Sequence, residues 1–176
     1  MVDAILECDV CRDRQFTVIR IVWGTGRAST PKASFDVALA AANVHQYNLR
    51  RLSSVIPAGV TVEEVGRAPD LGPTGGALDA VLARQTSQPG TRAAAGLAWA
   101  RATEESGGGP GIFYEEGNHD PATVRERLKA GVERGCHLRE INPSPVHTRV
   151  ITADPEAEAY TTAVVVAVYG DGTRLL

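Results

Sequence analysis

The sequence predicts a single α+β domain. A chain of 176 residues has the length of one domain with its own core. Three segments rich in β-branched residues and bounded by turn residues, 16–24, 60–65 and 160–170, are typical of strands. Residues 120–135 instead show helical spacing. Because strands and helices do not alternate strictly, α+β layers are favoured over a doubly wound parallel sheet.

The first strand and the first helix are predicted from consecutive segments. The strand "FTVIRIVWG" alternates until it meets Gly24 and Gly26, where we expect it to end. Thr30 suits a helix N-cap, and Pro31 suits the first helical position. One apolar face at helical spacing follows, made of Phe35, Leu39 and Ala42.

The second helix is predicted from "HDPATVRERLKAGVERG", the clearest helical stretch of the chain. Asp120 is expected to cap it, Pro121 to begin it and Gly135 to end it. Its predicted buried stripe consists of Val124, Leu128 and Val132.

Two Ala-rich segments, 76–85 and 91–102, stay open on the residues alone. Alanine is the best helix former, but the "SQPG" between them fits a hairpin turn equally well. The Gly-rich stretch at 105–111 is too short for an interdomain linker, and we expect a hairpin connection there.

Composition excludes several classes of protein. The net charge of -3 provides no basic field, so no nucleic-acid partner is expected. No window of 18 apolar residues exists, and acidic residues stand where a secretory signal would be basic. We therefore expect a cytoplasmic protein without a membrane partner. Three cysteines, Cys8, Cys11 and Cys136, are an odd number that argues against a disulfide framework.

Two motifs have competing interpretations. "GTGRAS" at 24–29 follows a strand and precedes a helix, as a nucleotide-binding loop would, but Ser29 replaces the third glycine. A tight strand-to-helix loop is the preferred interpretation. Cys8 and Cys11 have zinc-ligand spacing, and Cys136 with His137 would complete four ligands. A second Cys-x-x-Cys is missing, so no metal site is predicted.

Residues 29–57, "STPKASFDVALAAANVHQYNLRRLSSVIP", combine several unusual features. They contain a Thr-Pro loop, a Phe-Asp helix, an Asn-Leu step, and a Ser-Ser pair followed by an apolar pair and proline. In this pattern the segment resembles the pyruvoyl-dependent arginine decarboxylases. Weaker similarity extends through "GPTGGAL", the Pro-Gly at 89–90, the "EEG" at 115–117 and the C-terminal strand.

The resemblance implies a fold and an assembly. Residues 16–176 would form one domain, a four-layer αββα sandwich of the pyruvoyl-dependent decarboxylase type, and residues 1–15 an N-terminal extension outside it. Both Ala-rich segments would then be strands. Protomers of the family assemble as homotrimers or dimers of trimers, with active sites between subunits.

The resemblance also implies self-cleavage between Ser53 and Ser54, which makes Ser54 the precursor of a pyruvoyl cofactor. The Ser54 hydroxyl would attack the adjacent Ser53 carbonyl, a reaction favoured by proximity. Asn48 is expected to stabilise the oxyanion. Elimination and hydrolysis then leave a pyruvoyl group, which takes the electron-sink role that pyridoxal phosphate plays elsewhere. The implied activity converts arginine, a small-molecule substrate, to agmatine and CO2.

Substrate recognition is expected to involve Asp36. This residue matches the family aspartate that receives the guanidinium, for which a bidentate carboxylate is well suited. His45 and Tyr47 are bulkier than the small side chains expected around the substrate. A decarboxylase acting on another amino acid is therefore an alternative.

The proton donor is where the sequence departs most from the family. The family glutamate stands two residues before a Glu-Gly step, a position that holds Tyr114 here. By the strand period of two, Glu116 shares a face with Tyr114, whereas Glu115 points the other way unless a bulge shifts the register. We expect Glu116 to return the proton, Tyr114 to donate a hydroxyl or orient the substrate, and Glu115 to be the fallback.

Two other functions are alternatives to a decarboxylase. A catalytically silent homologue would keep the fold as an assembly partner or regulator. A nucleotide-binding α/β protein would be built on "GTGRAS".

Overall fold

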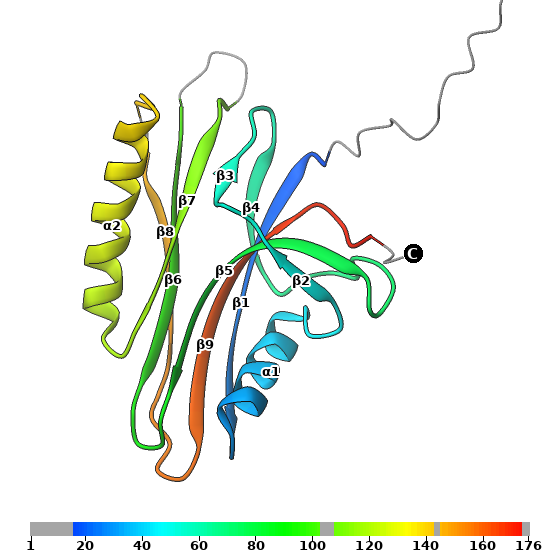
Figure 1. Cartoon of the computed structure of the whole chain (residues 1–176), viewed down its shortest axis with the longest axis vertical. Helices are drawn as coiled ribbons and strands as arrows, with labels where there is room; N and C mark the ends of the chain where they lie inside the picture. Colours follow the sequence, from blue (N-terminus) through cyan, green and yellow to red (C-terminus); the bar gives the residue numbers. More distant parts are fainter. Residues whose placement is uncertain (1–15, 103–107, 143–144, 174–176) are drawn as a thin grey trace, which may run out of the picture.

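A computed structural model describes residues 16–102, 108–142 and 145–173 (Figure 1). Two sheets and two helices make up this part of the chain. The five-stranded sheet contains β1 (Val18–Ala28), β2 (Asn48–Arg51), β4 (Thr61–Gly66), β5 (Ala77–Ser87) and β9 (Tyr160–Tyr169), in the order β2-β5-β9-β1-β4. The four-stranded sheet contains β3 (Val55–Ile56), β6 (Ala93–Arg101), β7 (Gly111–Asn118) and β8 (His147–Ala153), in the order β3-β7-β6-β8. The helices are α1 (Pro31–Ala42) and α2 (Pro121–Leu138).

The elements stack in four layers. The two sheets lie face to face, with α1 on the outside of one and α2 on the outside of the other (Figure 1). One apolar cluster fills the space between the sheets, a second lies beneath α1 and a third beneath α2. The described residues thus confirm the α+β class and the αββα arrangement.

Both helices begin where the sequence predicts. The Thr30 hydroxyl accepts the amide hydrogen of Ala33 at 3.2 Å. The Asp120 carboxylate accepts those of Ala122 and Thr123 at 3.1 and 3.0 Å. A further hydrogen bond from the Thr123 hydroxyl, together with these two backbone bonds, lowers the pKa of Asp120. The predicted stripe of α2 is fully buried: Val124, Leu128 and Val132. Within the described residues, no helix is long and apolar enough to cross a bilayer.

The Ala-rich segments are strands, as the resemblance implied. Strand β6 is buried along almost its whole length, since the other sheet covers one face and α2 the other. A strand buried on both faces is apolar throughout, and small side chains let the layers approach. The hairpin interpretation of "SQPG" is wrong, because β5 and β6 belong to different sheets.

Two predicted ends are also wrong. Strand β1 continues to Ala28, because Gly24 and Gly26 lie directly beneath α1 instead of turning the chain. Helix α2 continues through Gly135 to Leu138. Gly135 lies on the buried face of this helix, where an added Cβ would come within 2.3 Å of the Ile112 side chain. "GTGRAS" is therefore mostly strand, and the nucleotide-loop alternative loses its structural basis.

The contact between β1 and α1 predicts a large stability effect for Gly26→Ala. An added Cβ would lie 2.1 Å from the Ser34 carbonyl oxygen, a backbone atom that cannot move alone. We expect a loss of roughly 3 kcal/mol in the free energy of unfolding, at the upper end for overpacking. Chemical denaturation measures it. Gly59→Ala is the control, since open space surrounds that position and only its φ of 75° adds strain. An equal loss in both variants would contradict the close-packing explanation.

Candidate active site

Residues 52–54 form the crossing between the two sheets. They connect β2, which pairs with β5 at the edge of the five-stranded sheet, to β3, which pairs with β7 at the edge of the four-stranded sheet. Ser54 adopts φ 68°, in the left-handed region. Such a conformation costs a non-glycine residue about 1–3 kcal/mol and is concentrated at functional sites. The crossing therefore stores backbone strain at the serine pair.

Strand β7 holds Ser54 by two hydrogen bonds. The backbone N–H of Phe113 donates to the Ser54 carbonyl oxygen at 2.8 Å. The Ser54 hydroxyl donates to Oε2 of Glu115 at 2.9 Å. A carboxylate that accepts this hydrogen bond is placed to take the hydroxyl proton.

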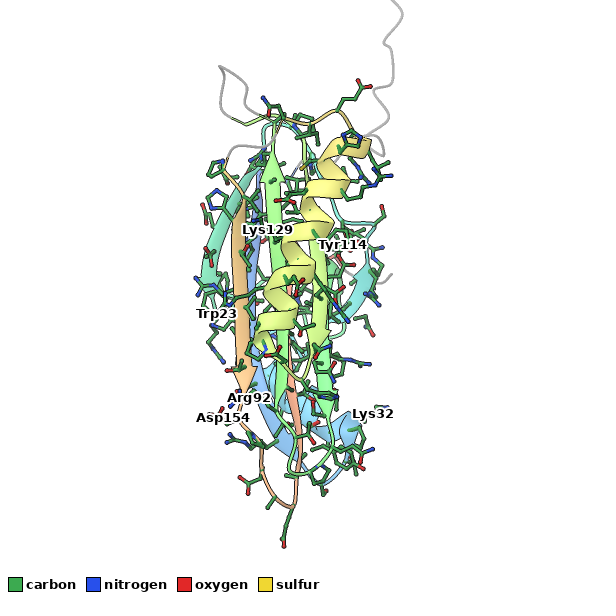
Figure 2. All side chains as sticks on the ribbon, turned by 90° about the vertical axis from the view of Figure 1, so that its left-hand side faces the viewer. Trp23, Lys32, Arg92, Tyr114, Lys129 and Asp154 are labelled. Atoms are coloured by element: carbon green, nitrogen blue, oxygen red, sulfur yellow. The ribbon has the colours of Figure 1, made fainter. Side chains whose placement is uncertain are left out.

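The alternation of β7 separates the two glutamates. Pairing between β6 and β7 has no bulge from Gly111 to Asn118. Tyr114 packs over Gly131 of α2 (Figure 2), and Glu116 lies 3.8 Å from the Arg127 guanidinium of the same helix. Tyr114 and Glu116 thus share a face, as expected, but this face is turned toward α2. The carboxylate in contact with Ser54 belongs to Glu115.

Two open cavities meet at Glu115 and Glu116. The smaller, about 370 Å³, has the serine pair in its wall. The larger, about 590 Å³, extends toward α1 and β2. Volumes of this size suit a small-molecule ligand. Besides the two glutamates, the larger cavity is lined by Phe35, Leu39, Tyr47, Asn48, Leu49, Arg51, Leu82, Ala83, Arg84 and Gly117.

The remaining predicted site residues are less closely gathered. Asn48 lines the larger cavity, but its side-chain amide donates to the Gly75 carbonyl at 2.7 Å. Tyr47 lines the same cavity with its hydroxyl engaged in the loop at 70–72. Asp36 and His45 are exposed and line neither cavity.

Three arginines in the cavity walls were missed by sequence reasoning. Arg51 and Arg84 line the larger cavity, and Arg84 stacks on the Phe35 ring at 4.7 Å. Arg139 lines the smaller one. The alternation of side chains along β5 indicates which face of the sheet Arg84 lies on, but this argument requires knowing that the segment is a strand.

Cys8 and Cys11, which have the spacing of zinc ligands, lie outside the described residues. Within the described ranges, no group of three or more His, Cys, Asp or Glu side chains is arranged to hold a metal ion. Cys136 lies on the buried face of α2, and burial raises the pKa of its thiol.

Comparison with known proteins decides the family. The family described as pyruvoyl-dependent arginine decarboxylase matches residues 18–174. The chain belongs to this family. It is 50% identical over 158 residues to the pyruvoyl-dependent arginine decarboxylase of Halobacterium salinarum, covering 87% of this chain and 94% of the relative. It is 31% identical over 150 residues to that of Methanopyrus kandleri, covering 85% and 93%.

Membership of the pyruvoyl-dependent arginine decarboxylase family supports a carbon–carbon lyase and does not favour the silent homologue. The crossing fits the pyruvoyl group that the family name implies. Ser54 is half-buried, strained and hydrogen-bonded to a carboxylate, and it opens onto a cavity large enough for a small molecule.

Proposed function

We propose that the chain cleaves itself between Ser53 and Ser54 and then decarboxylates arginine to agmatine and CO2. The observation that supports this most strongly is the strained Ser54, whose hydroxyl lies 2.9 Å from the Glu115 carboxylate. The names of the relatives in Halobacterium and Methanopyrus suggest arginine as the substrate. A cytoplasmic location is part of the same proposal.

Self-cleavage begins with an acyl shift. Glu115 takes the Ser54 hydroxyl proton while Oγ forms a bond to the Ser53 carbonyl carbon. The C–N bond then breaks, and the proton passes to the departing nitrogen. Loss of the Ser54 Cα proton next breaks the Cβ–Oγ bond and releases the Ser53 carboxylate. One water hydrolyses the remaining enamine, with loss of ammonia. The products are chains 1–53 and 54–176, the second beginning with a pyruvoyl group.

Asn48 is the proposed donor to the oxyanion of the acyl shift. Removing one such donor typically costs roughly 3–4 kcal/mol of transition-state stabilisation. The Asn48 amide now donates to Gly75, so this role requires its side chain to reorient toward Ser53.

After cleavage, the pyruvoyl group supplies a carbonyl that binds the substrate amine and an electron sink for the breaking C–C bond. The carboxyl of Glu115 then holds the proton that returns to the substrate carbon, because Glu115 faces residue 54 directly. Glu116, with its Arg127 partner, and Tyr114, packed on α2, shape the cavity wall beside it.

A homotrimer, or a dimer of trimers, is the proposed assembly. Large apolar side chains are exposed on both sides of the serine pair: Leu52 is 37% and Val55 45% exposed, and Tyr114 nearby is 39% exposed. A second copy covering them would enclose the cavities, which are open in a single chain. Sedimentation of the purified protein measures this assembly directly.

Asp36 is the proposed guanidinium ligand, and Asp36→Asn is expected to raise the KM for arginine. Asp36 is exposed and lines neither cavity, but the preceding Phe35 lines the larger one, so the proposal requires the substrate guanidinium to extend out of that cavity. Loss of a charge-assisted hydrogen bond corresponds to roughly a 10- to 100-fold change. Glu133→Gln, an exposed acid on the outer face of α2, is the control.

The test follows CO2 and amine release from a panel of amino acids by both variants and by the unmodified protein. An unchanged KM in Asp36→Asn would refute the guanidinium assignment. Turnover of another amino acid but not arginine would refute the substrate and favour the alternative suggested by His45 and Tyr47.

A further inference from the structure

Tyr169, in the five-stranded sheet, contacts the chain directly after the crossing at residues 52–54. It is the last residue of β9 and is only 6% exposed. Its ring makes edge-on contacts with Phe16 and Phe113, at centroid distances of 5.5 and 6.2 Å. Its hydroxyl donates to the Val55 carbonyl oxygen at 2.9 Å. Val55 directly follows the serine pair.

The backbone on the C-terminal side of the proposed cleavage point is therefore held from both sheets. From β7, the Phe113 N–H holds the Ser54 carbonyl. From β9, the Tyr169 hydroxyl holds the next carbonyl along the chain. Strained conformations persist only where the surroundings over-determine them. The carbonyls of Ser54 and Val55 are held by donors from different sheets. Together these two hydrogen bonds constrain Ser54 to its left-handed φ.

The Tyr169 hydroxyl stays protonated and can therefore always donate its hydrogen bond to the Val55 carbonyl. Burial raises the pKa of this phenol far above its usual value, and the nearby Glu115 carboxylate raises it further. The group thus keeps its proton throughout the range in which carboxylates titrate, and it cannot replace Glu115 as a base. Its contribution is geometric.

We propose that Tyr169 is a positioning residue for self-cleavage, which anchors the Val55 carbonyl so that Ser54 keeps the strained conformation from which its hydroxyl attacks Ser53. This inference rests on the proposed function. Tyr169 touches none of the reacting atoms and acts through the Val55 backbone. It also lies 114 residues from Val55 in the sequence, so the effect is a tertiary one.

The test compares Tyr169→Phe with two controls. Tyr160→Phe removes a phenol hydroxyl at the opposite end of the same strand. Phe16→Leu weakens the ring contact with Tyr169 but leaves its hydroxyl in place. Each freshly translated protein is followed by intact mass and thermal unfolding. Hydroxylamine, which cleaves the ester but not the peptide bond, reports the acyl shift separately from the elimination.

We expect Tyr169→Phe to slow both cleavage and hydroxylamine trapping by roughly three- to tenfold, the range that one hydrogen bond supplies. Tyr160→Phe should cleave like the unmodified protein, and Phe16→Leu should lose thermal stability without losing cleavage rate.

The inference is wrong if the unmodified protein cleaves and Tyr169→Phe cleaves equally fast. It is also wrong if Phe16→Leu slows cleavage as much as Tyr169→Phe, because packing would then explain the effect. An unmodified protein that never cleaves instead refutes the proposed function itself, and the inference with it.

Discussion

Ser54→Ala should remain one uncleaved chain of 176 residues, and this is the largest effect that we expect. The substitution removes the Oγ that attacks the Ser53 carbonyl and that later leaves from Cβ. Without it neither the acyl shift nor the elimination has a reacting atom. The variant should therefore contain no pyruvoyl group and release no CO2 from arginine. Intact mass and an assay of CO2 release measure the two consequences.

Ser53→Ala is the matched control for this experiment. The proposed role of Ser53 needs its backbone carbonyl and not its hydroxyl, so Ser53→Ala should still yield two chains. If Ser54→Ala also yielded two chains, contaminating proteolysis would explain the cleavage. If Ser53→Ala failed to cleave while keeping its fold, the Ser53 hydroxyl would need a role that the acyl shift does not give it.

Glu115→Gln is expected to lower arginine turnover by about 100-fold or more, measured per mole of cleaved chain. The reason is that Glu115 contacts Ser54 and is the proposed proton donor, and a positioned general acid typically contributes roughly 10²- to 10⁴-fold. The amide of glutamine keeps the size of the side chain but cannot deliver this proton. The same substitution should slow self-cleavage, because the Ser54 hydroxyl loses its carboxylate acceptor.

Glu116→Gln and Tyr114→Phe are the controls on the other face of β7. Both should keep turnover within a few-fold of the unmodified protein, because the two side chains contact α2. A wild-type rate in Glu115→Gln, together with a large loss in Glu116→Gln, would overturn this assignment. It would restore Glu116 as the donor, which was the expectation from the sequence.

Local chemistry explains which parts of the fold could be predicted. Thr30 and Asp120 cap helices through bonds to residues two or three positions away, and such signals are readable in the sequence. Gly24 and Gly26 predict a strand end from local sequence, but the strand continues, because both glycines make room for a helix that is a tertiary neighbour. Alanine propensity was overridden in β6 for the same reason, since burial on both faces decided its structure.

The candidate site was predictable in part. The motif around Ser53 and Ser54 pointed to the crossing, and the period of two correctly paired Tyr114 with Glu116. No local pattern could tell which face of β7 meets Ser54, because this depends on where the chain passes between the sheets. Tyr169 gave no signal at all, since its partner Val55 lies in another layer and far away in the sequence.

Self-cleavage at the strained crossing is best tested by the intact mass of the purified, unmodified protein. We expect two chains, 1–53 and 54–176, whose masses sum to that of the precursor plus one water minus one ammonia. The larger chain should have a blocked N-terminus that reacts with carbonyl reagents. A single species at the full-length mass after prolonged incubation would show that the protein does not cleave itself.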